Sequence, residues 1–228
     1  MTTFGIVWGT IATVSLVAFG EGIYKHTQKE FHGLGDKLVI LWPGNTAKPF
    51  KGLPRGRWIR FVDDDVELLK QEIPDITVAS TEYGASAPMT YGRKTVTQQV
   101  AAVFPEYQTA RNIVAEAGGR FLNQMDMDYR KRVLFIGNSI RDDLFGQGVN
   151  PVGQYVILKG VPFLVIGVLR EKTQNSSYNG RDAYRVFIPA STYKTMFSRT
   201  YPDNIVYQVA DPLHSKRVQD KVYQVLGR

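Results

Sequence analysis

The first twenty residues of this 228-residue chain contain no charged side chain. Within them, residues 4–20 are mostly apolar or small. A helix of twenty residues is about 30 Å long, which matches the hydrocarbon thickness of a bilayer. The small and hydroxyl-bearing residues of this stretch suit close packing between helices in lipid. We therefore predict a transmembrane helix here, with a polar helical extension, over residues 1–32.

Two other interpretations of this segment stay open. Ala18, Phe19 and Gly20 form a small-x-small pattern that fits a cleaved signal peptide, although no basic region precedes it. A helix buried in the core of a soluble protein is the third possibility, and the absence of a polar face argues against it. Orientation does not follow from charge, because Lys25, Lys29 and Lys37 flank only one side and the positive-inside rule needs both.

Composition narrows the chemistry of the rest of the chain. Lys and Arg number 28 against 21 Asp and Glu, which gives a formal charge of +7, and cysteine is absent. Disulfides, thiolate metal sites and cysteine nucleophiles are therefore excluded. With three histidines in the whole chain, metal and acid–base chemistry are also disfavoured.

Beyond residue 36, β-branched runs alternate with helical stripes, which predicts an α+β fold. A helix over 62–73 begins near Asp63 and Asp64, and the last helix follows Asp211-Pro212. The other predicted helices cover 105–117, 139–145 with a capping box from Ser139, and 189–197. The predicted strands cover 38–42, 76–80, 95–104, 132–138, 155–159, 163–169, 184–188 and 205–209.

The sequence contains no complete catalytic or nucleotide-binding motif. Gly92–Thr95 lacks a glycine that a phosphate-binding loop needs, Gly33–Gly35 lacks the third glycine of a dinucleotide fingerprint, and the HExxH and GxSxG patterns are absent. Asp63–Asp65 cannot converge on one ion, because consecutive helical residues point about 100° apart. We interpret these aspartates as capping and solvated groups, and extend this interpretation to Asp126, Asp128, Asp142 and Asp143. No catalytic, cofactor-binding or metal-ligating residue is predicted, and no cofactor.

Residues 37–60 carry six basic side chains, no acidic one, and interleaved aromatics. Single-stranded nucleic acid binders combine these features, but no nucleic-acid motif accompanies them here. A solvated loop is the favoured interpretation. Contact with anionic lipid headgroups or with a partner protein is the second, and no nucleic acid partner is predicted.

The segment Arg132–Leu169 resembles the middle of the MacB-like periplasmic core domain of ABC transporter permeases, in the FtsX-like permease family. The shared features are Gly137, Leu144–Gly146, Gly153 and Val165–Val168. Further parts of the chain resemble the family in the same order, namely residues 5–9, 20–22, 104–107, 118–121 and 187–189. We expect the glycines to serve turns and close packing rather than ligand binding.

This resemblance implies a Porter-like α/β subdomain formed by 36–118 and 186–228, with a β-rich Sabre-like subdomain, 119–185, inserted. It implies a non-catalytic domain that relays ATPase-driven movement to export of a macrolide, peptide or lipoprotein-type substrate. The implied partners are a cytoplasmic ABC ATPase subunit, a periplasmic adaptor protein, a second permease copy and membrane lipid. The implied location is the bacterial inner membrane, with residues after about 32 on the periplasmic or extracellular side.

The sequence departs from that family in one respect: it contains neither an ATPase domain nor the second to fourth membrane spans. We therefore expect a part of a permease rather than a complete transporter. Two other functions remain open, namely a secreted or anchored ligand-binding module unrelated to ATP-driven transport, and an exported hydrolase.

Overall fold

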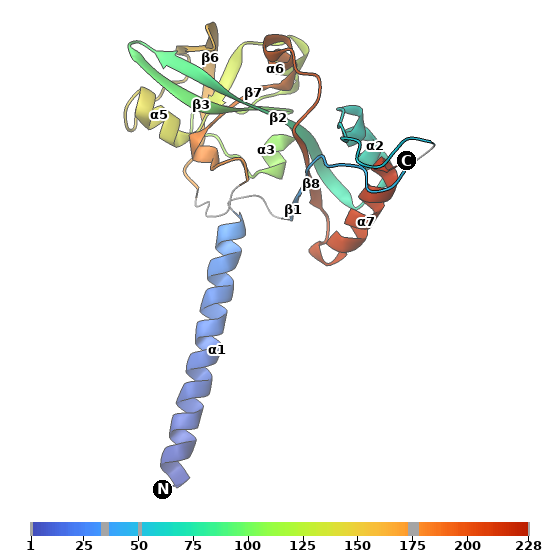
Figure 1. The fold of residues 1–228 in the computed structure, drawn as a ribbon. Helices are drawn as coiled ribbons and strands as arrows, with labels where there is room; N and C mark the ends of the chain where they lie inside the picture. The colour runs from blue at the N-terminus through green and yellow to red at the C-terminus, as the bar shows by residue number, and fades with distance from the viewer. Residues whose placement is uncertain (1, 33–36, 50–51, 173–177, 228) are drawn as a thin grey trace.

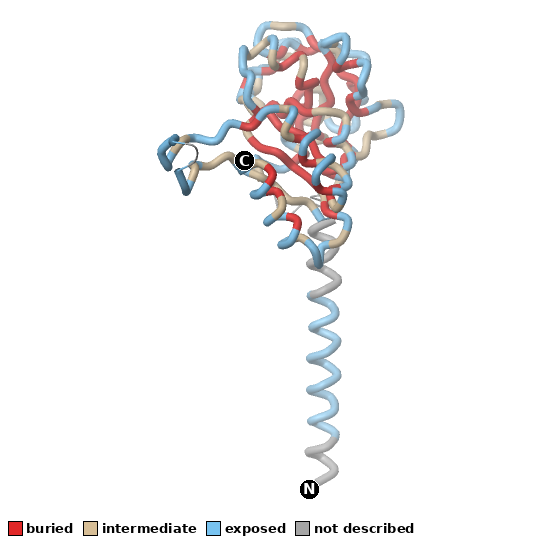
Figure 2. Tube along the Cα trace, turned by 90° about the vertical axis from the view of Figure 1, so that its right-hand side faces the viewer, coloured by how far each residue is buried: buried red, intermediate tan, exposed pale blue. Residues whose placement is uncertain are grey.

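A long helix leads into the folded body of the protein (Figure 1). The computed structural model describes the backbone of residues 2–32, 37–49, 52–172 and 178–227. Helix α1, Thr2–His32, projects from the body, and its described side chains are exposed (Figure 2). The predicted helix and its polar extension are thus confirmed.

The membrane-spanning character predicted for this helix is not confirmed. Among the residues that the structure describes, no helix is both long and apolar enough to cross a membrane. The side chains described in α1 begin at Val7 and end at Ile23, so the predicted span over residues 4–20 lies partly outside them.

The body is built on one eight-stranded sheet with the order β1-β8-β2-β3-β7-β4-β6-β5. Its strands are β1 Leu38–Leu41, β2 Ile76–Tyr91, β3 Lys94–Val103, β4 Val133–Ile136, β5 Tyr155–Leu158, β6 Val161–Val168, β7 Arg185–Pro189 and β8 Asn204–Val209. The remaining helices are α2 Asp64–Glu72, α3 Tyr107–Ala110, α4 Gln124–Asp128, α5 Asn138–Leu144, α6 Ala190–Phe197 and α7 Ser215–Leu226. The predicted mixture of strands and helices is confirmed.

Strand β2 belongs to two parts of the sheet at once. Its first half, from Ile76 to Glu82, pairs with β8, whereas Met89 and Thr90 near its end pair with β5. The second pairing closes β2, β3, β7, β4, β6 and β5 into a barrel, while β8 and β1 extend the sheet beyond it. A single long strand therefore connects the barrel to the helix-covered part of the body.

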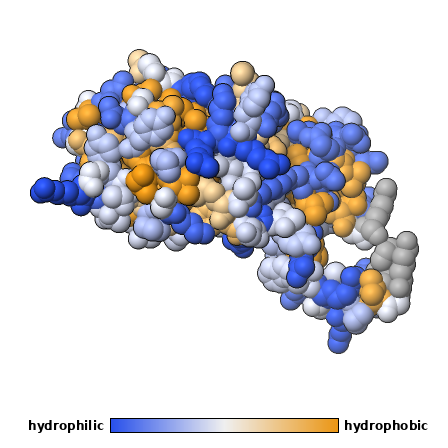
Figure 3. All heavy atoms as spheres, turned by 90° about the horizontal axis from the view of Figure 1, so that it is seen from above, coloured by the Kyte–Doolittle hydropathy of each residue, from blue (hydrophilic) through white to orange (hydrophobic). Residues whose placement is uncertain are grey.

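Each part has its own apolar core. Helices α2 and α7 cover one face of the β1-β8-β2 part, where Leu69 and Ile73 meet Val218 and Val222. A separate core fills the barrel and includes Met89, Leu134, Ile136, Phe163 and Ile188. From above, apolar side chains form groups separated by a hydrophilic band (Figure 3).

The predicted subdomain division stays a prediction. Strand β7, from the segment predicted as Porter-like, pairs with β4, from the segment predicted as Sabre-like. The same strand also pairs in parallel with β3. The two predicted parts therefore share one continuous sheet, so a boundary between them is not marked by a break in strand pairing.

Three local predictions are corrected by the structure. The helix predicted over 105–117 ends at Ala110, since Asn112 has a left-handed backbone (φ 49°) and Ala115 instead pairs with Leu169 in a β-bridge. The strand predicted over 76–80 continues to Tyr91. Helix α5 has Gly137 as its N-cap, without a side-chain cap, rather than Ser139.

Candidate functional site

Four charged residues lie buried where the barrel meets the helix-covered part. Glu82 belongs to β2, Arg111 follows α3, Asp182 opens a 3₁₀ turn over Asp182–Tyr184, and Arg185 begins β7. All four are at most 2% exposed. Charged side chains are almost never this deeply buried unless they are paired. We refer to Glu82, Arg111, Asp182 and Arg185 as the buried ion cluster.

The carboxylates of the cluster are matched by cations. Arg185 Nη2 donates to Glu82 Oε1, and Arg111 Nη2 donates to Asp182 Oδ1 at 2.6 Å. Lys172 Nζ lies 2.8 Å from Asp182 Oδ2, and Arg185 Nη1 lies 3.9 Å from Asp182 Oδ1. Arg185 therefore lies between the two carboxylates and links the two ion pairs.

Polar side chains complete the coordination of Glu82. The hydroxyls of Tyr107 and Tyr178 donate to Glu82 Oε2 at 3.0 and 2.8 Å, and the Asn204 amide donates to the same oxygen at 3.4 Å. The Arg111 guanidinium lies over the Tyr178 ring, 4.5 Å from its centroid. These contacts join β2, β8 and α3 to the loop before β7.

The surroundings of the cluster fix its charge state. Burial alone raises the pKa of the Glu82 carboxyl, but the charge and hydrogen bond of Arg185, with Tyr178 and Arg111, outweigh it, so that the net pKa lies below the ordinary value of 4.5. Burial also lowers the pKa of the Lys172 ammonium, against the opposing charge of Asp182. Burial raises the pKa of the Tyr107 hydroxyl, and the Glu82 charge raises it further.

This arrangement suits mechanical connection better than chemistry. The charged groups are largely withdrawn from solvent, and each is engaged with an opposite charge of the cluster or its neighbours. Removing one partner of a buried ion pair typically costs about 3–5 kcal/mol, because the other charge is left uncompensated. The buried ion cluster therefore holds the two parts of the sheet in a fixed relation.

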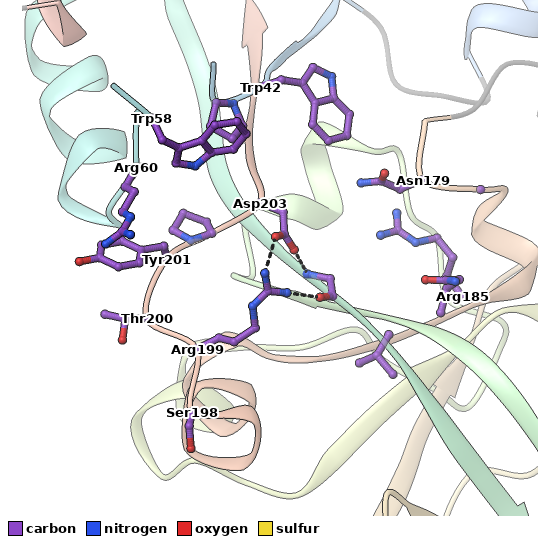
Figure 4. Close-up of a pocket in the computed structure, with 16 residues that line it drawn as sticks. Trp42, Trp58, Arg60, Asn179, Arg185, Ser198, Arg199, Thr200, Tyr201 and Asp203 are labelled. Atoms are coloured by element: carbon purple, nitrogen blue, oxygen red, sulfur yellow. Dashed lines mark hydrogen bonds and ion pairs between the residues drawn. The ribbon is translucent and has the colours of Figure 1, made fainter. Parts of the chain in front are cut away.

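A cleft opens beside the cluster (Figure 4). Its volume is about 1090 Å³, and Arg185 is one of its lining residues. Trp42 and Trp58 form one side in Figure 4, with Arg60 and Tyr201 beside Trp58. The cleft lies on the stretch of β2 around Gly84, between its pairing with β8 and its pairing with β5.

The predicted roles of two aspartates are corrected. Asp63 is the N-cap of α2 but makes no side-chain cap; it accepts hydrogen bonds from Thr81 Oγ1 at 2.8 Å, Tyr83 at 2.7 Å and Lys194. Asp126 does form a capping box with Asn123, yet it is buried rather than solvated. Asp63 connects α2 to β2 and α6, whereas the partners of Asp126 are local, namely Arg120, Asn123 and Lys131.

Other residues considered from the sequence lie apart from these sites. Asp128 accepts a hydrogen bond from Gln124 and Asp142 from Arg141, both locally on their helices. Within the described ranges, no group of three or more histidine, aspartate or glutamate side chains is placed to hold a metal ion. Phe50 and Lys51 of the basic stretch lie outside the described residues.

The glycines of the central segment serve packing and turns, as expected. A Cβ on Gly137 would overlap the backbone of Ala183, and a Cβ on Gly119 would lie 2.8 Å from the Cα of Gly167. Gly146 and Gly153 have positive φ angles of 109° and 89°, a conformation that favours glycine. These positions are therefore structural.

Sequence reasoning pointed to one side of the cleft and to none of the residues of the buried ion cluster. The basic aromatic stretch contains Trp42, Trp58 and Arg60, but nothing in the sequence connects it to Tyr201 and Arg199. The cluster joins residues that are far apart in the sequence, such as Glu82 and Arg185. From the sequence alone, isolated charged residues of this kind are interpreted as solvated surface groups. Only the sheet topology brings them together.

Comparison with known structures places the fold. The periplasmic region of MacB from Actinobacillus actinomycetemcomitans matches with a TM-score of 0.65 and 20% identity, over 88% of this chain and 89% of that one. The extracellular domain of the noncanonic ABC-type transporter YknZ from Gram-positive bacteria matches with a TM-score of 0.68 and 20% identity, over 83% of this chain and 92% of that one. The fold is that of the extracytoplasmic domains of ABC-type transporters.

Sequence comparison then gives the family. The family model described as the MacB-like periplasmic core domain matches residues 1–225, and the chain belongs to this family. The macrolide export ATP-binding/permease protein MacB of Bdellovibrio bacteriovorus is 29% identical over all of this chain and 35% of its own length. The pyoverdine export ATP-binding/permease protein PvdT of Pseudomonas savastanoi is 28% identical over all of this chain and 34% of its own length. The chain thus spans about a third of these curated relatives.

Proposed function

We propose that this domain is a non-catalytic relay that transmits ATPase-driven movement of an ABC permease to the export of its substrate. The observation that carries the proposal is the continuous sheet, in which β2 runs from the helix-covered part into the barrel. The buried ion cluster joins β2 to β7, and Asn204 joins β8 to Glu82 of the cluster. A body of this kind moves as one piece. The projecting helix α1 is its connection to the rest of the permease (Figure 1).

The proposed partners follow from the relatives. Their names combine an ATP-binding and a permease function in one protein, so the energy source is an ABC ATPase on the cytoplasmic side. Their named cargoes are macrolides and pyoverdine, and the proposed cargo here is a macrolide, peptide or lipoprotein-type molecule. A periplasmic adaptor and a second permease copy complete the proposed assembly, which acts at the inner membrane with residues after about 32 on its periplasmic side.

The relay is tested by breaking the connecting helix. In the full-length transporter that contains this chain, Ile23→Pro removes a backbone hydrogen bond within α1 and costs about 3 kcal/mol or more of helix stability. We expect ATP-driven export to fall at least tenfold, while ATP hydrolysis continues and the body keeps its thermal unfolding midpoint. Ile23→Ala is the control, since it keeps the helix and leaves export unchanged. Full export by Ile23→Pro, present in the membrane at the control's level, would refute the relay.

A ligand-binding module is the second candidate, and the cleft beside Arg185 is the observation that favours it. The two functions differ in their dependence on ATP. A relay loses its function when the ATPase is inactivated, whereas a binding module alone keeps its ligand affinity and its biological effect. Export measured with a hydrolysis-deficient ATPase therefore distinguishes them.

A further inference from the structure

One wall of the cleft consists of exposed tryptophan side chains. The chain contains three tryptophans, and two of them, Trp42 and Trp58, line the cleft, while the third, Trp8, belongs to α1. Trp42 is 49% exposed and Trp58 is 63% exposed. Large aromatic side chains left open to solvent around a concave surface are typical of binding sites.

Cations outnumber anions around this wall. Arg60, Arg185 and Arg199 line the cleft, against one carboxylate, Asp203. Asp203 is engaged, because its two oxygens accept from Arg199 Nη2 at 3.1 Å and from the Gly84 amide at 2.6 Å. Arg199 is thus paired with Asp203, and Arg185 is paired with Glu82, so that Arg60 is the cation of this wall whose charge is not matched by a carboxylate among the described residues.

Two of these arginines have unused donors. Arg60 is exposed and lies over the Tyr201 ring, 5.0 Å from its centroid, and among the residues that the structure describes it pairs with no carboxylate. Arg185 is 2% exposed, and its Nε is buried without a hydrogen-bond partner. A buried unpaired donor costs free energy unless a ligand or water satisfies it.

We propose that this cleft binds an organic anion that carries a flat apolar ring, such as an aromatic carboxylate, sulfonate or phosphate. The ring stacks against Trp42 and Trp58, and the anionic group accepts hydrogen bonds from Arg60, whose planar fork suits such anions. The volume of about 1090 Å³ accommodates a molecule of drug size. All residues of the proposed binding site come from this chain, and the proposal does not depend on the proposed relay function.

The position of the tryptophans provides the test. In the full chain carrying Trp8→Phe, tryptophan fluorescence comes only from Trp42 and Trp58. The probe is 8-anilinonaphthalene-1-sulfonate, an aromatic sulfonate that accepts energy from tryptophan. We expect saturable energy transfer from tryptophan to the probe. The affinity for the probe should be at least tenfold weaker after Trp58→Ala or after Arg60→Gln, and Trp58→Phe should retain the original affinity. Arg217→Gln, which alters an exposed arginine on α7, is the matched control and keeps the affinity.

A second probe separates the ring from the charge. N-phenyl-1-naphthylamine has the same ring systems without the sulfonate, and we expect it to bind at least tenfold more weakly. Equal binding of both probes, or unchanged affinity after either Trp58→Ala or Arg60→Gln, would overturn the proposal. Both substituted residues are exposed, and far-ultraviolet circular dichroism confirms that each variant remains folded.

Discussion

Single residues in this domain matter most where charge is buried. Glu82 and Arg185 face each other inside the body, and Tyr107 and Tyr178 satisfy the remaining carboxylate oxygen. Such a pair is costly to desolvate, so it contributes less to stability than its contacts suggest. Its importance lies in the penalty for breaking it, which keeps β2 and β7 in one arrangement.

The first prediction concerns this pair. Glu82→Gln leaves Arg185 buried beside a neutral amide, and we expect the free energy of unfolding to fall by about 3–5 kcal/mol. Arg185→Met should cost a similar amount. The loss in the free energy of unfolding of the double variant should be smaller than the sum of the two single losses, by at least about 1 kcal/mol. Urea unfolding of all four proteins measures this coupling, and simple additivity would show that the pair does not act as a unit.

The lowered pKa of Glu82 predicts how stability depends on acid. Because the folded state holds this carboxylate ionised below the ordinary value of 4.5, it binds fewer protons than the unfolded chain there. The stability from ionised Glu82 is complete above pH 4.5 and is lost as the pH falls through the folded-state pKa. Urea unfolding between pH 7 and pH 2 should therefore show a gap between wild type and Glu82→Gln that narrows in acid. A gap independent of pH would contradict this assignment.

At the scale of elements, the sequence predicted most of the fold. The stripe Val218, Val222 and Val225 correctly marked the buried face of α7, and Gly160 marked the turn between β5 and β6. The continuation of β2 was missed because Gly84–Ala87 are small residues without a strong strand preference. The helix predicted beyond Ala110 followed a real apolar pattern, but the bridge between Ala115 and Leu169, the residue after β6, determined the backbone there.

The candidate sites were harder to predict because they depend on topology. Local pattern detected the aromatic and basic residues near Trp42, since they lie close in sequence. The pairing of Glu82 with Arg185 arises from the strand order, in which β7 lies beside β3 and not beside its neighbours in the chain. The spacing of these residues along the sequence does not predict the order of the strands in the sheet.

Close packing between elements gives a third prediction. A Cβ at Gly167 in β6 would meet the Arg120 backbone at 2.5 Å and the Phe135 ring at 2.9 Å. We expect Gly167→Ala to lower the free energy of unfolding by about 1–3 kcal/mol through overpacking. Gly44→Ala is the control, because a Cβ there meets nothing within 4 Å and the backbone is not left-handed. Thermal or urea unfolding compares them, and equal stability of both variants would contradict the packing.

The whole molecule is a body with a long helix leading to it. The barrel and the helix-covered part share β2, and the buried ion cluster fixes their junction. The helix α1 projects from this body (Figure 2). In the proposed function, movement imposed at α1 displaces the body as a unit rather than bending it, as a relay in an export permease requires.

Spin-label distances in the full-length transporter test this claim most directly, because the chain itself has no cysteine and accepts labels at chosen sites. After other cysteines of the transporter are replaced, labels are attached at Tyr155→Cys in β5 of the barrel and at Lys216→Cys in α7 of the helix-covered part. The distance between these two labels reports on the arrangement of the two parts within one body. A single label at Tyr155→Cys reports on the distance between two copies. We predict that ATP binding changes the distance between copies and leaves the distance within one body unchanged. A change within the body, or no change between the copies, would contradict the account.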